Sequence, residues 1–504
     1  MKKILKNIPK KYKQIYLELL NENKILKNEL LLLKEQVKLF LHRKYSSNAD
    51  EIYPGARLLF NEAEEDNSVE KLEEIDESQD VKPYKRKRPK RKPIPENIPR
   101  VDKIYELSEK DLKCSTDETK LIKIGEDISE QLDIIPAKIQ VIRHIRFKYA
   151  CKTCEENIKI APMAPQPIPK SLASPGLLAH IAVSKYEDSL PLYRQEQIFK
   201  RIGIDMPRSS LASWMIKASQ LLSPIIDKMK QDLLTSNYLQ CDETPVQVLK
   251  EPNKPAKSKS YMWVVSKAEP YKNIVLYHYS PSRSGLVPVN ILCGFKGYLQ
   301  TDGYEGYNQI RSQPDVYGVA CLSHIRRKFI DAVNAKKKPS KAGICVTGLD
   351  YITKLYSVEK QAREMTSKER YYFRLKKAQP IIDELKEWLF DKVNYIPPQS
   401  LTGKAMKYFV KQWPRFINYL EDGKIEVDNN RCERMVRPFT IGRKNWIFSA
   451  TVSGAKASAD LYSLIVTAKQ NGLNTYDYLR MVLSEIPKIK SSNINHLMPY
   501  KKLN

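Results

Sequence analysis

The sequence predicts a multidomain protein of the α plus α/β class, in which helical segments accompany one mixed sheet. Three observations indicate this fold. Leucine-rich heptads occupy the N-terminal segment, helical periods fill residues 170–236, and short runs of β-branched and aromatic residues follow from residue 237. At 504 residues the chain is long enough for roughly three domains, each with a core of its own.

The charge of the chain predicts a polyanionic partner. A formal net charge of +27 favours nucleic acid or an anionic membrane surface. No apolar run of about eighteen residues occurs and the N-terminus MKKILKNIPKKY lacks a signal-peptide core, so we expect a cytoplasmic protein that does not enter a membrane. The eight cysteines are scattered, which favours a reducing compartment over a disulfide scaffold.

Residues 1–60 are predicted to form a coiled-coil oligomerisation segment. Apolar residues recur at alternating steps of three and four: Tyr16, Leu19, Leu26, Leu30, Leu33, Val37 and Phe40. Asn23 occupies a seam position, where one polar side chain can fix register and strand number. The seam predicts a homo-oligomer, and an intramolecular helical hairpin that uses the same seam remains the alternative.

Residues 61–100 are predicted to be a linker without a packed core, first acidic and then basic. Its basic part, KPYKRKRPKRKPIPENIP, combines prolines with like charges and is suited to follow DNA phosphates without reading sequence. The predicted DNA contacts are Lys85, Arg86, Lys87, Arg88, Lys90, Arg91 and Lys92. An intramolecular contact with the acidic run remains the alternative.

Residues 101–160 contain half of a zinc-binding pattern. Cys151 and Cys154 form a Cys-x-x-Cys pair, and Cys114 lies upstream. A structural zinc ion takes four ligands, so Asp117 and His144 are the candidates for the fourth. A Zn²⁺ site is one prediction, and a metal-free unit held by its own core is the other.

Residues 161–236 are predicted to be a helical DNA-binding region. Leu190–Arg201 and Arg208–Leu222 read as two helices joined by a turn that contains Gly203 and Pro207. This is a helix-turn-helix-like pattern, in which Arg208 at the start of the second helix can meet DNA. Ordinary helix packing gives the same pattern and remains the alternative.

A mixed sheet with helices on its faces is predicted after residue 237. The expected elements are strands at Tyr238–Leu249, Tyr261–Ser266, Ile274–Tyr279, Gly297–Thr301 and Val316–Leu322, then a helix at Ser323–Asn334. Asp242 lies within the first strand, where a carboxylate must be paired or bind a cation. Asp302 ends the fourth strand, where an acid beside glycine is also a common turn residue.

A third acid lies in the stretch from Ile425 to Phe448. A short helix is predicted there, beginning at Asp428 or Asn429 and ending near Arg437, because Pro438 cannot continue a helix far. One face of this helix carries Asn429, Asn430, Glu433 and Arg437. Such a helix can present the carboxylate of Glu433 at a fixed place, although surface pairing of Glu433 with Arg437 remains the alternative.

The strings CDETPVQVL, YLQTDGYEGYN, SHIRRKF and VDNNRCERMVRPFTIGRKNWIF, followed by LYSLIVTAKQNG, resemble the DDE transposases of the insertion-sequence family numbered sixty-six. The similarity covers nearly the whole chain in family order. It implies a ribonuclease-H-like catalytic domain at 237–450 with a helical insertion at 336–424, and a C-terminal helical region at 451–504. The family's first Cys-x-x-Cys zinc pair is replaced here by Cys114-Ser-Thr-Asp117.

The resemblance implies that the three catalytic acids are Asp242, Asp302 and Glu433. They would hold two Mg²⁺ or Mn²⁺ ions, with Asp242 bridging both, and stabilise an in-line displacement at phosphorus. Glu243, Glu305 and Asp428 are left out of this set. The residues expected to contact phosphate near the site are Arg326, Arg327, Arg437, Arg443 and Lys444, with His324; Cys321 and His324 are not expected to form a zinc pair.

The function implied is a DNA transposase that binds double-stranded DNA at the inverted-repeat ends of its mobile element, cuts the 3′ ends and joins them to target DNA. Accessory proteins encoded by the same element are possible partners. A bacterial, nucleoid-associated location is expected. Two alternatives remain: a catalytically inactive DNA-binding relic, and a ribonuclease-H-like nuclease without strand transfer.

Overall fold

The computed structural model describes residues 10–45, 139–149, 159–267, 272–335, 343–489 and 493–500. The chain divides into one unit of Met1–Val69 with Ala164–Asn504 and a second unit of Glu70–Met163. The basic contacts predicted from Lys85 to Lys92 and the zinc ligands predicted at Cys114, Asp117, Cys151 and Cys154 lie outside the described residues. Within the described ranges, no helix has both the length and the apolar character to cross a bilayer.

The N-terminal heptads form one continuous helix, α2 (Lys10–Tyr45). Its seam is uncovered, since Leu19, Leu26, Leu30, Leu33, Val37 and Phe40 each expose more than half of their surface. An intramolecular hairpin would bury these side chains, and the described residues contain no such partner helix. An exposed apolar row at heptad spacing is the surface that a second coiled-coil strand covers, so the homo-oligomer stays a prediction.

The described part of the second unit is small. β1 (Lys148–Tyr149) and β2 (Lys159–Ile160) pair in antiparallel register, and the Arg146 side chain donates to the carbonyl of Ala161 over 2.6 Å. His144, a candidate zinc ligand, is exposed just before β1.

Three helices precede the sheet: α5 (Pro175–Tyr186), α6 (Leu192–Arg201) and α7 (Arg208–Leu234). The two helices and the turn predicted between Leu190 and Leu222 are confirmed, but the predicted end of the second helix is wrong. α7 continues through Pro224 because Ile225, Met229 and Leu233 extend its fully buried face. That packing outweighs the single backbone hydrogen bond that proline removes.

The sheet contains β3 (Tyr238–Lys250), β4 (Lys259–Lys267), β5 (Ile274–Ser280), β6 (Gly297–Thr301) and β7 (Val316–Ala320) in the spatial order β5-β4-β3-β6-β7. The first three strands are antiparallel, whereas β6 and β7 continue the sheet in parallel with β3. β8 (Ser449–Thr451) pairs with the far end of β3. The predicted mixed sheet is therefore confirmed, and it is consistent with the ribonuclease-H-like core that the resemblance implies.

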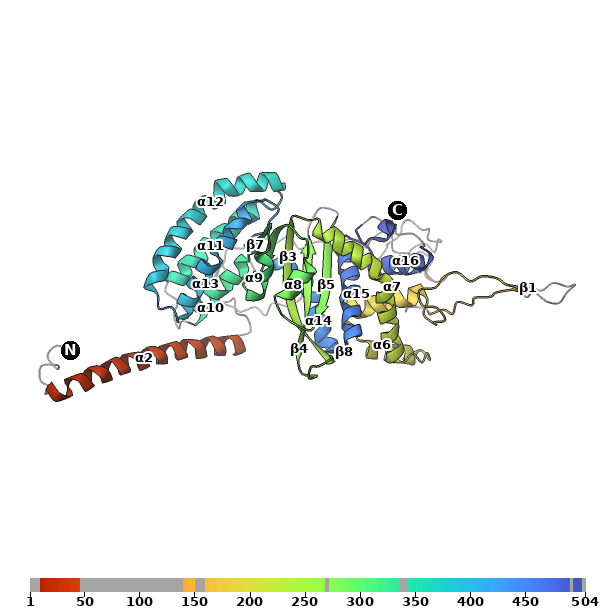
Figure 1. The fold of residues 1–504 in the computed structure, drawn as a ribbon, viewed down its shortest axis with the longest axis horizontal. Coiled ribbons are helices and arrows are strands. Elements are labelled where there is room, and N and C mark those ends of the chain that lie inside the picture. The colour runs from red at the N-terminus through yellow and green to blue at the C-terminus, as the bar shows by residue number, and fades with distance from the viewer. Residues whose placement is uncertain are drawn as a thin grey trace, which may run out of the picture. The chain divides into compact units, whose positions relative to one another are not determined.

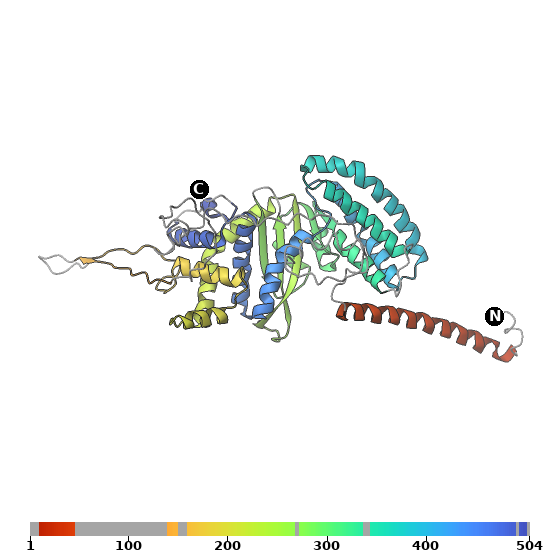
Figure 2. The same cartoon turned by 180° about the vertical axis from the view of Figure 1, so that it is seen from behind.

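Helices protect the sheet on its face and at its edge. α14 (Asn430–Trp446) packs across β3 and β4, and α15 (Val452–Gln470) lies along β5 (Figures 1 and 2). The outward N–H groups of Val275 and Tyr277 on β5 donate to the hydroxyls of Thr467 and Ser463 over 3.0 and 2.8 Å. An edge strand satisfied in this way is closed to pairing with another chain.

The insertion predicted between the second and third acids is helical where it is described. It follows α10 (Leu322–Asn334) and contains α11 (Ile344–Gln361), α12 (Ser367–Lys392) and α13 (Leu401–Phe416), gathered beyond β7 in Figure 1. Thr366 and Glu369 form a capping box at the start of α12. A second buried core joins these helices to α10 and β7.

Between α7 and α15, Asp460 gives the first testable prediction. Its Oδ2 accepts a 2.6 Å hydrogen bond from the Ser219 hydroxyl, and burial raises the pKa of Asp460 from 3.8 to about 6. A raised folded-state pKa means that stability is highest below about pH 4 and is lost as pH rises through about 6.

Asp460→Asn keeps the acceptor for Ser219 without the charge. It should therefore raise the free energy of unfolding by about 3 kcal/mol at pH 8 and leave it nearly unchanged at pH 4, measured by urea unfolding. An equal gain at both pH values would contradict the assignment.

Candidate functional site

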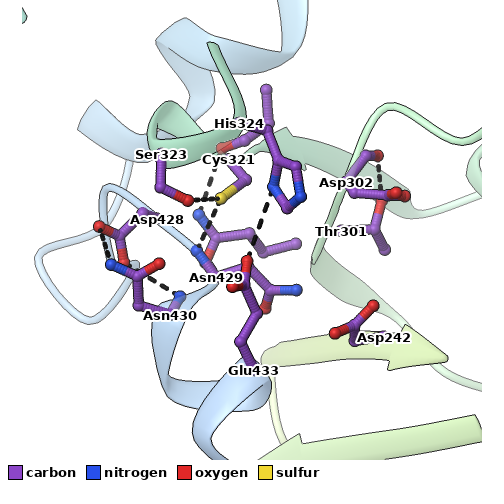
Figure 3. Close-up of polar contacts among 12 residues, drawn as sticks. Asp242, Thr301, Asp302, Cys321, Ser323, His324, Asp428, Asn429, Asn430 and Glu433 are labelled. Carbon is purple, nitrogen blue, oxygen red and sulfur yellow. Dashed lines mark hydrogen bonds and ion pairs between the residues drawn. The ribbon is translucent and has the colours of Figure 1, made fainter. Parts of the chain in front are cut away.

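The three predicted acids come from three separate elements. Asp242 lies within β3, Asp302 directly follows the last residue of β6, and Glu433 lies in the first turn of α14. β3 and β6 run in parallel with Gln240 opposite Gln300, so each aspartate stands two residues beyond a paired glutamine at the same end of the sheet. Figure 3 shows Asp242 on β3, with Asp302 and Glu433 reaching toward it from the loop after β6 and from α14.

The start of α14 is fixed against both β3 and α10. The side-chain amide of Asn429 donates to the carbonyl of Cys241 over 3.1 Å, and its backbone N–H donates to Sγ of Cys321 over 3.1 Å. Oδ1 of Asp428 accepts from the backbone N–H of Asn430 (Figure 3). These contacts set the rotation and position of the helix, and therefore the place of Glu433 one turn later.

A buried polar network lies beneath the acids. Gln300 Oε1 accepts from the Tyr238 hydroxyl over 2.6 Å and from Gln240 Nε2 over 2.8 Å. Gln300 Nε2 donates to the carbonyls of Ala320 and Glu426, and Gln240 Nε2 also donates to that of Asp428. The network ties the segment before α14 to three strands, and it is absent from the sequence-based predictions. A signal for it exists, since LQCD at 239–242 and LQTD at 299–302 repeat the same spacing of glutamine and aspartate.

The electrostatics of the cluster favour a cation. Burial raises the pKa of Asp242 well above its ordinary value. The negative charges of Glu243 and Glu433, and then of Asp302, raise it further. Neighbouring carboxylates repel one another, and either a proton or a bound cation relieves this repulsion.

Two atoms of the cluster are buried without hydrogen-bond partners among the described residues: Oε1 of Glu433 and Nδ1 of His324. They are 3.7 Å apart (Figure 3). An unsatisfied buried oxygen on a carboxylate is costly, and a divalent cation is one partner that removes that cost. Among the described residues, the ligand atoms that all lie within 4.8 Å of one another are those of Cys321, His324 and Glu433, and the three acids do not form such a group. A cation held by Asp242, Asp302 and Glu433 therefore stays a prediction.

Cys321 also lies here, with ligand atoms of Cys321, His324 and Glu433 all within 4.8 Å of one another. Burial raises the pKa of the Cys321 thiol to about 12, and its sulfur already accepts the N–H of Asn429. The sulfur is thereby tied to the residue that precedes α14. Burial lowers the pKa of His324 below its ordinary value, although the negative charge of Glu433 acts in the opposite direction.

The loop that carries Asp302 is held from behind. Arg311 Nη2 donates to the carbonyl of Asp302 over 2.6 Å and contacts the Thr301 hydroxyl, while Oδ1 of Asp302 accepts the N–H of Tyr304 over 2.9 Å. Burial lowers the pKa of Arg311 to about 10. Gly303 has no room for a side chain, because a Cβ there would lie 2.8 and 2.9 Å from two ring carbons of Tyr408.

The acids left out of the predicted set have other partners. Glu243 is bound by Arg283, whose Nε donates over 2.8 Å, and by the Tyr307 hydroxyl. Glu305 is exposed and pairs with Lys411 over 2.8 Å. Asp428 accepts the backbone N–H of Asn430, the first residue of α14, and the hydroxyl of Tyr356.

The predicted phosphate contacts differ in accessibility. Arg208, Arg327 and Lys444 are exposed, and Arg437 is half-buried. Arg443 is half-buried with Nη1 donating to the Thr244 hydroxyl and the carbonyl of Pro245. Arg326 is only 1% exposed, so the prediction that it contacts phosphate does not hold: a side chain without exposed surface cannot reach a DNA backbone.

The predicted end of the third helix is also wrong. α14 does not stop near Arg437 but continues through Pro438 to Trp446. Phe439 is fully buried and packs against Tyr462, with ring centroids 5.4 Å apart, so the apolar face continues beyond the proline. That burial outweighs the lost backbone hydrogen bond.

Comparison with known proteins covers most of the chain. A family model described as "Transposase IS66 family" matches residues 170–457, which include all three acids. Models described as "zinc-finger binding domain of transposase IS66", "IS66 C-terminal element" and "Transposase C of IS166 homeodomain" match residues 111–155, 463–500 and 32–102.

Two relatives come from Sinorhizobium fredii (strain NBRC 101917 / NGR234). "Uncharacterized protein y4jD" is 34% identical over 415 residues, which is 80% of each chain. "Uncharacterized protein y4qI" is 31% identical over 432 residues, covering 82% of this chain and 78% of the relative. No solved structure matches. The family models and the extent of these similarities show that the chain belongs to the IS66 family of transposases.

Proposed function

We propose that this transposase binds double-stranded DNA at the ends of its element, cuts the 3′ ends and joins them to target DNA at one site formed by Asp242, Asp302 and Glu433. The proposal is supported by the convergence of β3, the loop after β6 and the first turn of α14, where the charges of Glu433 and Asp302 raise the pKa of Asp242. The net charge of +27 supports a nucleic-acid substrate.

Asp242, Asp302 and Glu433 would hold the divalent cations, Mg²⁺ or Mn²⁺, two per site. Their all-oxygen ligand set suits Mg²⁺, and Oε1 of Glu433, which accepts no hydrogen bond among the described residues, has a lone pair available for it. When bound, such ions stabilise the charge on the attacking and leaving oxygens of a displacement at phosphorus.

The protein's own residues supply position. The Gln240 and Gln300 network fixes the entry to α14, and Arg311 fixes the loop of Asp302. His324 is half-buried and lies beside Glu433, with its Nδ1 3.7 Å from Oε1 of that carboxylate. Preorganised groups of this kind avoid the cost of reorganisation during the reaction.

Both chemical steps are displacements at a single phosphorus atom. In the first, the oxygen of water bonds to phosphorus, the bond from phosphorus to the 3′ oxygen breaks, and a 3′-hydroxyl is left on the element end. In the second, that hydroxyl attacks a target phosphorus and releases a target 3′-hydroxyl. Because the geometry of the two displacements is the same, a single set of acids serves both.

The test uses purified full-length protein with Mg²⁺ or Mn²⁺ and a duplex that carries the terminal repeats of the element. We expect 3′-end nicks and strand-transfer products, both abolished by EDTA and restored by added Mg²⁺. Nicks without joined products would indicate a nuclease. Binding without nicks would indicate an inactive relic.

Three further properties belong to this proposal. The exposed seam of α2 would form a homo-oligomer, which light scattering can measure.

The unit that contains Cys114, Cys151 and Cys154 would bind Zn²⁺, with Asp117 or His144 as the fourth ligand, and metal analysis of the purified protein tests this. Accessory proteins of the same element would act beside it in a bacterial, nucleoid-associated setting.

A further inference from the structure

One face of α10 leads from the acid site to the surface. His324 lies beside Glu433 near the start of this helix, and Arg327 and Lys328 follow three and four residues later. This spacing puts all three on one side of the helix. Arg327 and Lys328 are both exposed. The route from the carboxylates to solvent along α10 is therefore lined by positive charge.

α13 contributes a second row of positive charge. Lys404, Lys407 and Lys411 are exposed and are separated by three and four residues, so they share one face. The opposite face, with Met406 and Phe409, is buried in the core of the insertion. The row is a consequence of the amphipathic pattern of α13, but its polar face carries lysine at each of these turns.

Specific contacts place the two rows beside each other and beside Asp302. Lys328 Nζ lies 5.8 Å from the centre of the Tyr408 ring, and Tyr408 packs against Gly303, the residue after Asp302. Lys411 Nζ lies 2.8 Å from Oε1 of Glu305 on the same loop. The row of lysines on α13 therefore lies next to the loop that carries Asp302.

These cations have few partners of their own. In the described part of the chain, Arg327, Lys328, Lys404 and Lys407 form no ion pair. The pair of Lys411 with Glu305 is exposed at both ends, with 57% and 75% of the side chains open to solvent. Exposed pairs of this kind contribute little, so a phosphate group can replace the carboxylate.

The exposed face of α13 also differs from that of a membrane-binding helix. No large apolar side chain of α13 is exposed, although membrane-surface helices bury such a face in the lipid. Between Lys404 and Lys411 the helix rises by about 10 Å, which corresponds to about three base-pair steps of a duplex. A stiff polyanion that continues beyond the reacting phosphate fits this row.

We propose that Arg327, Lys328, Lys404, Lys407 and Lys411, here called the insertion track, bind the backbone phosphates of double-stranded DNA next to the phosphodiester that reacts at the acids. The insertion is then a part of the DNA-binding surface. The track rests on the proposed function, because it assumes that DNA is the substrate. It reads no sequence, since lysine contacts to phosphate position a duplex without distinguishing bases.

The test compares the full-length protein with the triple variant Lys404→Ala, Lys407→Ala, Lys411→Ala. Alanine retains helix propensity at these exposed positions, so folding is preserved, and circular dichroism verifies this. The matched control is Lys376→Ala, Lys377→Ala, Lys386→Ala, which removes the same charge from exposed positions of α12. Affinity for a duplex with the element end and for an unrelated duplex is measured by fluorescence anisotropy over a range of salt concentrations.

We expect the magnitude of the negative slope of log affinity against log salt concentration to fall by about 3 in the α13 variant, about one for each lost lysine contact. The decrease in affinity should be equal for the duplex with the element end and for the unrelated duplex. The control should keep the wild-type slope. An unchanged slope in the α13 variant, or an equal change in the control, would overturn the proposal.

Failure of the insertion track can be distinguished from failure of the proposed function. Wild-type nicking together with an unchanged slope in the α13 variant rejects the track and leaves the transposase intact. A reduced slope without any nicking by the wild type supports the track and rejects the reaction. A second measurement gives position: a photo-crosslinker on Lys407→Cys should label backbone within about five base pairs of the cleaved bond. Labelling only at distant positions would reject the track.

Discussion

Asp242→Asn is expected to abolish cleavage and strand transfer while leaving the affinity for element ends nearly unchanged. Asn keeps the shape of Asp and can still accept the N–H of Glu243, which Oδ1 of Asp242 accepts over 2.8 Å. It removes the charge through which this residue would hold both cations. A loss of about 4 kcal/mol in transition-state stabilisation corresponds to a decrease of about a thousandfold in rate. Single-turnover nicking and anisotropy on the same duplex measure the two quantities.

The stability of this variant separates a metal-binding role from a structural one. Burial and neighbouring negative charge raise the pKa of Asp242, so its ionised form opposes folding when no cation is bound. Asp242→Asn should then leave the melting temperature unchanged or raise it in EDTA at pH 8. A structural role would instead lower the melting temperature, and cleavage and binding would fall together.

Asp315→Asn is the matched control. Asp315 precedes β7 at the opposite end of the sheet from Asp302, is exposed, and pairs only with Lys296 in the part of the chain that the structure describes. Its φ of 62° is one that asparagine tolerates. The same chemical change there should leave nicking within about twofold of the wild type, since exposed substitutions of this kind have small effects.

The sheet and its helical neighbours were predictable because their signals are local. β3 to β7 each combine β-branched or aromatic residues with boundaries at glycine, proline or polar residues, and the predicted strands agree with them within three residues at each end. The three acids could be proposed for a different reason. A carboxylate within an apolar strand and another directly after a strand are unusual enough to stand out, and the family resemblance joined them to Glu433.

The errors arise where packing between distant segments decides the outcome. Pro224 and Pro438 predict helix ends, but both helices continue because their apolar faces remain buried beyond the proline. Arg326 and Arg327 are adjacent and chemically alike, yet one is buried and the other exposed. Their positions on α10 relative to the insertion decide this, and periodicity in one segment does not contain that information.

The contacts that hold the site in place could not be predicted from the sequence for the same reason. Arg311 fixes Asp302 from nine residues away, but Tyr408 reaches the same loop from more than a hundred residues further along the chain. Only the glutamines at 240 and 300 left a readable signal, as the repeated spacing to the following aspartate.

Gly303→Ala is expected to reduce nicking by about a hundredfold, although it changes no ligand. A Cβ at this position would overlap the hydroxyl of Tyr408 and lie 2.8 Å from its Cε2, so either the loop or the tyrosine must move. Overpacking of this kind costs about 1–3 kcal/mol in stability. A displacement of about 1 Å in Asp302 is enough for the predicted loss of rate. Single-turnover nicking and thermal unfolding measure the two effects.

Tyr408→Leu provides the internal control, because leucine has no atoms at the positions of the tyrosine hydroxyl, Cζ and Cε2 that exclude a Cβ. If the clash displaces Asp302, the double variant Gly303→Ala, Tyr408→Leu should nick as fast as Tyr408→Leu alone, with a coupling energy of about 1–3 kcal/mol between the two sites. Additive losses would mean that the alanine acts on the loop through its backbone and not through Tyr408. A Gly303→Ala protein with wild-type nicking would mean that Tyr408 moves away from the new Cβ and Asp302 keeps its place, and it would contradict the predicted loss.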